Sequence, residues 1–277
     1  MAAKTYLAGD LGGTKTLLSL YREIDGQLKK EHSHRYRSAD WQDLESMLKH
    51  FLNQSPADLP KPTTSCIAVA GPVHQGSAKL TNLPWQLSQT SLSAATGLER
   101  LELVNDFAVL IHGLSHLSDE QQVVLQTGRD KATPAPGGTE NGPVAILGAG
   151  TGLGMARGLP IAGGWLAIPS EGGHREFSPR TEDEWELAQW LRQDLGLQRL
   201  SIERIVSGTG LGHVMNWLLH RQPETEHCLR AHAHAWRTMT ADQPGYQDLP
   251  SCTGKAAASG DPLAGEALKL WLGAYGS

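Results

Sequence analysis

The chain contains few cysteines, and none of them is paired in sequence. Its 277 residues include only Cys66, Cys228 and Cys252, and no two of these stand in a C-x-x-C arrangement. This spacing argues against a zinc knuckle and against a dithiol redox centre. Cys66 lies in an apolar run, so we expect it to be a small buried side chain.

Basic charge and long hydrophobic runs are also lacking. The net charge is −5 and the isoelectric point is near 6.2, whereas nucleic acids and anionic membranes are bound by basic surfaces. No apolar stretch is long enough to span a bilayer, and the N-terminus has no signal-peptide pattern. We therefore expect a cytoplasmic protein with no nucleic-acid partner and no membrane partner.

Strand patterns dominate the first part of the chain. Short apolar runs flank Gly-rich turns within residues 6–21 and 143–156, and each of these patterns predicts a β-hairpin. Residues 66–70 and 101–104 predict two buried strands, and the more polar stretch 27–37 predicts another.

Helices are expected between these strands and through the last third of the chain. Apolar residues at helical spacing from Trp41 to Leu52 predict a helix that Asp40 caps. Thr181, Ser201 and Asp261 are expected to cap later helices. Each half of the chain has a strand, a Gly-rich turn and a returning strand, so the sequence predicts an α/β protein with two related halves.

The first Gly-rich turn is Asp10-Leu11-Gly12-Gly13-Thr14. Glycines allow backbone N–H groups to approach an anion closely, and Thr14 adds a hydroxyl donor. Asp10 is suited to hold Mg²⁺ through water, since this ion keeps most of its waters and takes few carboxylates. An ordinary hairpin turn is the alternative that this segment leaves open.

The second Gly-rich turn, residues 148–154, resembles a dinucleotide-binding loop only superficially. Counted from Gly148, the last glycine of G-x-G-x-x-G is replaced by Leu153, and a strand-like run follows in place of a helix. An NAD-dependent dehydrogenase is therefore disfavoured. The turn is not a Walker A loop either, so a phosphate-binding hairpin is the remaining interpretation.

Polar residues that suit sugar phosphorylation follow these turns. Asp106 ends a strand where a helix begins, and phosphoryl transfer to a hydroxyl needs a carboxylate that accepts the proton. Glu171 and His174 flank two glycines and can pair with vicinal hydroxyls. The alternatives are a helix cap for Asp106, a polar surface turn for residues 171–174 and a capping box for Glu203.

Two segments carry a family resemblance. LAGDLGGTKT (7–16) and AILGAGTGLGMA (145–156) resemble the two phosphate motifs of the hexokinase, actin and Hsp70 superfamily, and the whole pattern is most similar to bacterial glucokinase. The resemblance implies an actin-like (ribonuclease H-like) α/β fold with two domains and an active-site cleft between them. It also implies transfer of the γ-phosphoryl group of ATP to glucose, with Mg²⁺.

The resemblance assigns roles to individual residues. Asp106 is the implied base, and Asp10 is the implied metal ligand. The implied sugar-binding residues are Asn82, Asn105, Asp106, Glu171, His174 and Glu203. The implied nucleotide-binding residues are Gly9, Asp10, Leu11, Gly12, Gly13, Thr14, Lys15, Gly150, Thr151 and Gly152.

The resemblance also bears on domains and on related branches. It divides the chain into a small domain, 1–110, and a larger one, 111–277, which lacks the family's C-terminal adenosine-binding segment, so a truncated kinase is expected. Residues 175–179, directly after His174, include no cysteine, which favours the zinc-free branch over the related repressor and kinase family. No helix-turn-helix precedes the first hairpin, so a repressor is disfavoured. A homodimer is possible, and an inactive sugar-binding homologue is the alternative function.

Overall fold

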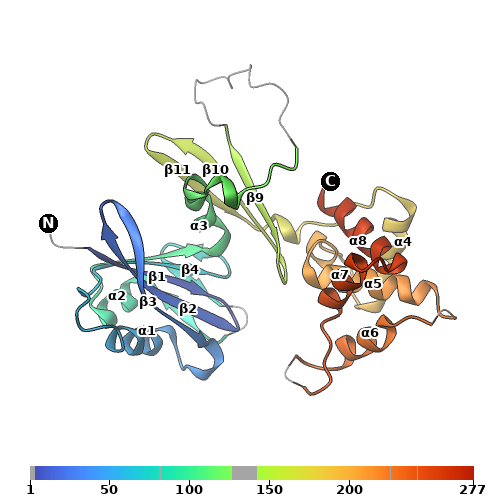
Figure 1. Cartoon of the computed structure of the whole chain (residues 1–277), viewed down its shortest axis with the longest axis horizontal. Coiled ribbons are helices and arrows are strands. Elements are labelled where there is room, and N and C mark those ends of the chain that lie inside the picture. The colour runs from blue at the N-terminus through green and yellow to red at the C-terminus, as the bar shows by residue number, and fades with distance from the viewer. Residues whose placement is uncertain (1–3, 81–82, 127–141, 225, 242) are drawn as a thin grey trace. The chain divides into compact units, whose positions relative to one another are not determined.

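The computed structural model of the chain describes residues 4–80, 83–126, 142–224, 226–241 and 243–277. The chain forms two compact units (Figure 1), one made of Met1–Val144 and Ala156–Pro169 and the other of Ala145–Met155 and Ser170–Ser277. Each unit has its own hydrophobic core. The domain boundary at residue 110 stays a prediction. Among the described helices, none is long and apolar enough to cross a bilayer.

A five-stranded sheet with the order β3-β2-β1-β4-β8 forms the centre of the first unit (Figure 1). Its strands are β1 Thr5–Leu11, β2 Lys15–Ile24, β3 Gln27–Arg37, β4 Thr64–Val69 and β8 Arg100–Asn105. β1 and β2 form the first predicted hairpin, and β1, β4 and β8 are parallel. The carboxyl ends of these three strands therefore lie at one edge of the sheet, which carries Asp10 and Asn105.

Three helices and a small sheet complete most of this unit. The helices are α1 Leu44–Asn53, α2 Gln89–Thr96 and α3 Asp106–Gly113. The small sheet consists of β5 Val73–His74, β6 Ser77–Lys79 and β7 Gln86–Ser88. Short 3₁₀ turns lie at η1 Ser38–Asp40, η2 Leu114–His116 and η3 Asp119–Gln121. The apolar side of α1 and Leu92 of α2 pack in one core with the buried leucines of the large sheet.

The start of α1 corrects one prediction from the sequence. The helix is not capped by Asp40, which ends the 3₁₀ turn η1. Asp43 is the cap, because its Oδ1 accepts the N–H of Ser46 at 2.7 Å. Two aspartates three residues apart both match the capping pattern, and the 3₁₀ turn at Ser38 decides between them by shifting the helix start.

A third sheet with the order β11-β10-β9 contains the second predicted hairpin. Its strands are β9 Val144–Ala149, β10 Leu153–Ile161 and β11 Gly164–Ser170. The division between the two compact units passes through these strands, so the hairpin tip belongs to the second unit and the far ends of β10 and β11 to the first.

The remainder of the second unit is helical, as predicted. Its helices are α4 Glu182–Asp194, α5 Gly208–Arg221, α6 Leu229–Thr238, α7 Leu249–Ala258 and α8 Pro262–Tyr275. Two 3₁₀ turns, η4 Gly172–His174 and η5 Ile202–Arg204, precede them or lie between them. The predicted caps Thr181 and Asp261 are confirmed, since their side chains accept the N–H groups of Glu184 and Ala264. The third predicted cap, Ser201, precedes the 3₁₀ turn η5, and its side chain makes no cap bond there.

Candidate active site

The first phosphate hairpin is fixed by a buried serine. The turn closes with a hydrogen bond from the Gly12 N–H to the Lys15 carbonyl at 3.0 Å. Ser38, which is fully buried, donates from its Oγ to the Gly12 carbonyl at 2.9 Å, and its N–H donates to the Thr14 carbonyl at 3.0 Å. Ser38 therefore holds both sides of the tip, and sequence reasoning missed it because it lies 26 residues from Gly12.

Asp10 lies beside this tip, at the end of β1. Its side chain is exposed, and its position pairs with Ala68 of β4, which in turn pairs with Val104 of β8. Two strand spacings amount to about 10 Å. The edge of the sheet therefore carries Asp10 and the start of α3 on strands about 10 Å apart.

Asn105 caps α3, and Asp106 is the first residue of the helix. The Asn105 Oδ1 accepts the N–H groups of Phe107 at 3.1 Å and Ala108 at 2.9 Å. Its Nδ2 donates to the Gly71 carbonyl at 3.1 Å and to the Asp106 Oδ1 at 3.0 Å. The alternative that Asp106 serves as the helix cap therefore does not hold. Asp106 occupies the first turn of α3, and Asn105 orients its carboxylate.

A cavity of about 290 Å³ opens beside Asn105. Its polar lining comes from Gln75, Asn105 and His112, and its apolar lining from residues that include Leu103, Val109 and Pro169. His112 lies two helical turns from Asn105, so both side chains fall on one face of α3. That spacing is the signal by which sequence reasoning could have added His112 to the surroundings of the site.

The second phosphate hairpin is fixed to the start of α5. The Gly208 N–H donates to the Gly150 carbonyl at 2.7 Å. The Thr209 hydroxyl donates to the Thr151 carbonyl at 3.0 Å. Gly208 permits this approach, since a Cβ there would stand 3.0 Å from the Gly150 oxygen. The tip of the hairpin is therefore held through its carbonyl groups, and its N–H groups are not consumed by these bonds.

Glu203 is bonded to the same hairpin. Its Oε2 accepts the N–H of Leu153 at 2.9 Å, across 50 residues of sequence. A Cβ at Gly152 would clash with this oxygen, so the glycine makes room for the carboxylate. The alternative role of Glu203 in a capping box is not what the structure shows, because the residue lies in the 3₁₀ turn η5 and bonds to a strand.

Three predicted sugar ligands come together around Glu203. The His174 Nε2 lies 3.5 Å from the Glu171 Oε2, and the His174 Nδ1 lies 3.9 Å from the Glu203 Oε1. The side chains of Glu171 and His174 are more than half exposed, and that of Glu203 is 26% exposed. The cluster therefore offers two carboxylates and an imidazole to a ligand from solvent.

A short pairing of chain segments brings these residues together. Glu176 and Ser201 form an isolated antiparallel bridge. On either side of it, the Phe177 N–H donates to the Leu200 carbonyl at 2.8 Å and the Ile202 N–H to the Arg175 carbonyl at 2.9 Å. The bridge sets the turn that carries His174 beside the turn that carries Glu203.

The predicted site residues thus divide between the units. Asp10, Asn105 and Asp106 lie in the first unit, and Glu171, His174 and Glu203 lie in the second together with residues 150–152. Asn82 lies outside the described residues.

Nearly the whole chain matches a family model. The glucokinase model matches residues 7–277. This chain belongs to the glucokinase family. Curated glucokinases of Synechocystis sp. and Nostoc sp. are each 36% identical to it, over 98% of this chain and 78% of their own length. The family predicted from the two phosphate motifs is confirmed, and its members are ATP-dependent sugar kinases.

Solved structures agree with this family assignment. A glucokinase from an Antarctic psychrotroph superposes with a TM-score of 0.71 at 28% identity, over 98% of this chain and 76% of that one. A glucokinase of the ROK family from Streptomyces griseus, solved with glucose and AMPPNP, gives 0.54 at 16% identity, over 98% and 75%. At that identity the second likeness bears on the fold alone. The predicted actin-like α/β fold is confirmed.

The glycines of the second hairpin supply a matched test of the Glu203 contact. A Cβ at Gly152 clashes with the Glu203 carboxylate, whereas a Cβ at Gly150 meets open space. We expect Gly152→Ala to displace Glu203 from Leu153 and to lower the free energy of unfolding by about 1–3 kcal/mol. Gly150→Ala should change it by less than about 1 kcal/mol. Urea denaturation of both variants measures the difference, and equal losses would contradict the contact.

His213 of α5 makes the stability of the second unit dependent on pH. Burial lowers the pKa of His213, and the hydrogen bond that its Nδ1–H donates to the Arg204 carbonyl at 2.9 Å opposes this in part. Asp194 also raises the pKa and Arg237 lowers it. Because the unfolded imidazole gains a proton near about pH 6.5, stability is complete above that pH and falls below it, by at most about 1.4 kcal/mol per pH unit.

The test compares His213→Asn with the unchanged protein. Asparagine keeps a donor for the Arg204 carbonyl and cannot titrate. We expect the unfolding midpoint in urea to fall between pH 7.5 and pH 5.5 by less in the variant than in the unchanged protein. An identical fall in both would show that other groups carry the pH dependence.

Proposed function

We propose that this chain transfers the γ-phosphoryl group of ATP to the 6-hydroxyl of glucose and releases ADP and glucose 6-phosphate. The observation that best supports this proposal is the pair formed by Asn105 and Asp106. Asn105 takes over the capping of α3, and its amide orients the adjacent carboxylate at 3.0 Å. A carboxylate fixed at the end of a parallel strand, where ligands of α/β sheets bind, suits a base.

In the proposed reaction, Asp106 accepts the proton of the sugar 6-hydroxyl. The sugar oxygen forms a bond to the γ-phosphorus, and the bond from that phosphorus to the β–γ bridging oxygen breaks, so that ADP leaves. Such a transfer depends on position and on neutralisation of charge more than on covalent chemistry. Asn105 contributes the position of the base.

The sugar is proposed to bind at Glu171, His174 and Glu203, and Asn105 remains a predicted contact. Carboxylates accept and an imidazole donates or accepts, which matches a ring of vicinal hydroxyls. The separation of 3.5 Å between His174 and Glu171 places two such groups within reach of neighbouring hydroxyls. Asn82 remains a further predicted contact.

The nucleotide is proposed to bind at the two Gly-rich hairpins. Ser38 fixes the first through the carbonyls of Gly12 and Thr14, and Gly208 fixes the second through the carbonyl of Gly150. Backbone N–H groups of such turns form concave sites for phosphate oxygens.

Mg²⁺ is part of the proposal, as are two further properties of the chain. Asp10 is an exposed oxygen ligand beside the first hairpin, so its chemistry fits the ion. When bound, Mg²⁺ neutralises phosphate charge, and Asp10 would hold it through water.

A cytoplasmic location and a homodimer, both expected from the sequence and the resemblance, belong to the same proposal.

The base is tested with Asp106→Asn, which keeps the size of the side chain and removes the proton acceptor. We expect kcat to fall by about 10²–10⁴-fold, while the dissociation constant for glucose stays within a few fold. A coupled assay of ADP release gives kcat, and tryptophan fluorescence gives the affinity. Near-normal turnover would show that the carboxylate is not the base.

The sugar cluster is tested with His174→Ala and Glu171→Ala. Each substitution leaves a sugar hydroxyl without its partner, at a cost of about 1–3 kcal/mol, so glucose affinity should fall by roughly 5- to 150-fold. Glu224→Ala, which removes an exposed carboxylate from another part of the same unit, is the charge control and should leave the affinity unchanged. Unchanged affinity in both cluster variants would refute the assignment.

A further inference from the structure

A second cavity lies at the opposite end of the large sheet. It has a volume of about 530 Å³ and is lined by the segments that precede β4 and β8 and by the end of α1. β4 is six residues long, and at about 3.3 Å per residue this separates the two edges of the sheet by about 20 Å. The cavity is therefore distinct from the edge that carries Asp10 and Asn105.

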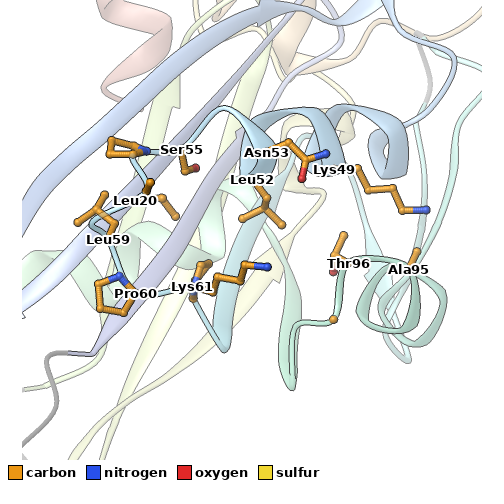
Figure 2. A pocket seen from close by; sticks show the side chains of 14 residues that line it. Leu20, Lys49, Leu52, Asn53, Ser55, Leu59, Pro60, Lys61, Ala95 and Thr96 are labelled. Carbon is orange, nitrogen blue, oxygen red and sulfur yellow. The ribbon is translucent and has the colours of Figure 1, made fainter.

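The charged groups that line this cavity are of one sign. Lys49 and Lys61 contribute two ammonium groups, and no carboxylate is among the lining residues. Lys49 pairs with Glu45 at 2.6 Å, whereas Lys61 has no ion pair or hydrogen bond within the described parts of the chain. In Figure 2 the Lys61 side chain extends from its loop toward the side of the cavity that holds Thr96. In a chain with a net charge of −5, this is a local positive site.

Two hydroxyls beside the cavity are bonded to backbone carbonyls of α1 and α2. The Ser55 hydroxyl donates to the Phe51 carbonyl at 3.0 Å, and the Thr96 hydroxyl donates to the Leu92 carbonyl at 2.6 Å. The amide of Asn53 lines the cavity and has no hydrogen-bond partner among the described residues.

The sheet beneath this end also holds unused hydrogen-bonding groups. Leu20 lines the cavity. In the sheet, Leu20 is the cross-strand partner of Leu7 in β1, and Leu7 is the partner of Ser65 in β4. Ser65 and Thr5 therefore lie on the same face of the sheet as Leu20. The hydroxyls of both are buried and lack a partner within the described chain. Buried hydroxyls of this kind are usually paired, but neither residue lines the cavity, so these hydroxyls are not part of the proposed site.

The rest of the lining is apolar. Leu20, Leu52 and Leu59 contribute side chains, together with prolines at 56, 60 and 62 (Figure 2). Ligand sites are typically of this size, with an apolar wall and a few polar groups that fix orientation.

We propose that this cavity binds a small organic anion, which has an apolar body bearing a phosphate or carboxylate group. The anionic group pairs with Lys61 and Lys49, the Asn53 amide donates to it or to a neighbouring oxygen, and the apolar body covers Leu52 and Leu59. Binding of this anion does not require phosphoryl transfer at the other edge of the sheet.

Phenyl phosphate and benzoate are the probes, titrated by calorimetry into the full chain. Inorganic phosphate and phenol are the two partial ligands. We expect both probes to bind more tightly than either partial ligand, since charge and apolar contact are each needed. Binding of phenyl phosphate no tighter than that of inorganic phosphate would refute the apolar part of the site, and absence of binding by either probe at about 10 mM would refute the site.

Variants locate the binding. The double variant Lys49→Gln and Lys61→Gln should bind both probes about tenfold more weakly, because two partly exposed charge contacts are lost. Lys29→Gln with Lys30→Gln removes two exposed lysines of β3 in the same unit and should leave the affinity unchanged. Asp106→Asn should also leave it unchanged, which separates this cavity from the phosphoryl-transfer site. Equal affinity in the Lys49 and Lys61 variant would refute the proposal.

Discussion

One hydrogen bond connects the two chemical parts of the second unit. The Glu203 Oε2 holds the N–H of Leu153, which ends the phosphate hairpin, while the Oε1 of the same carboxylate lies 3.9 Å from His174 in the sugar cluster. A single side chain therefore links the hairpin tip to the proposed sugar ligands. The contact depends on a glycine at 152, since any side chain there would occupy the space of the carboxylate.

In the first unit, neutral side chains hold the corresponding groups in position. Ser38 fixes the hairpin tip through the carbonyls of Gly12 and Thr14, and Asn105 fixes the carboxylate of Asp106. The two hairpins are held by distant residues, Ser38 and Glu203, whereas Asp106 is held by its neighbour Asn105. Rigid support of this kind is what a phosphoryl-transfer site needs, because its rate depends on position.

The sequence predicts the local features well. The hairpins, the strand over 27–37 and the caps at Thr181 and Asp261 depend on neighbouring residues, and the structure contains all of them. The start of α1 was wrong, because Asp40 and Asp43 both satisfy the capping pattern and only the turn at Ser38 decides between them. The bonds from Ser38 to Gly12 and from Leu153 to Glu203 could not be predicted, because the two residues of each pair lie 26 and 50 positions apart.

The bonding of Asn105 limits how its side chain can take part in the proposed sugar site. Its Oδ1 accepts from two N–H groups of α3, and its two amide hydrogens go to the Gly71 carbonyl and to Asp106. The side chain therefore has no unused donor. A sugar hydroxyl that takes an amide hydrogen must replace either Gly71 or Asp106. Replacement of Gly71 leaves the bond from Asn105 to Asp106 in place, whereas replacement of Asp106 leaves its Oδ1 with the Phe107 N–H at 3.0 Å. If Asn105 both binds the sugar and bonds to Asp106, as proposed, the sugar has to compete with the backbone carbonyl of Gly71.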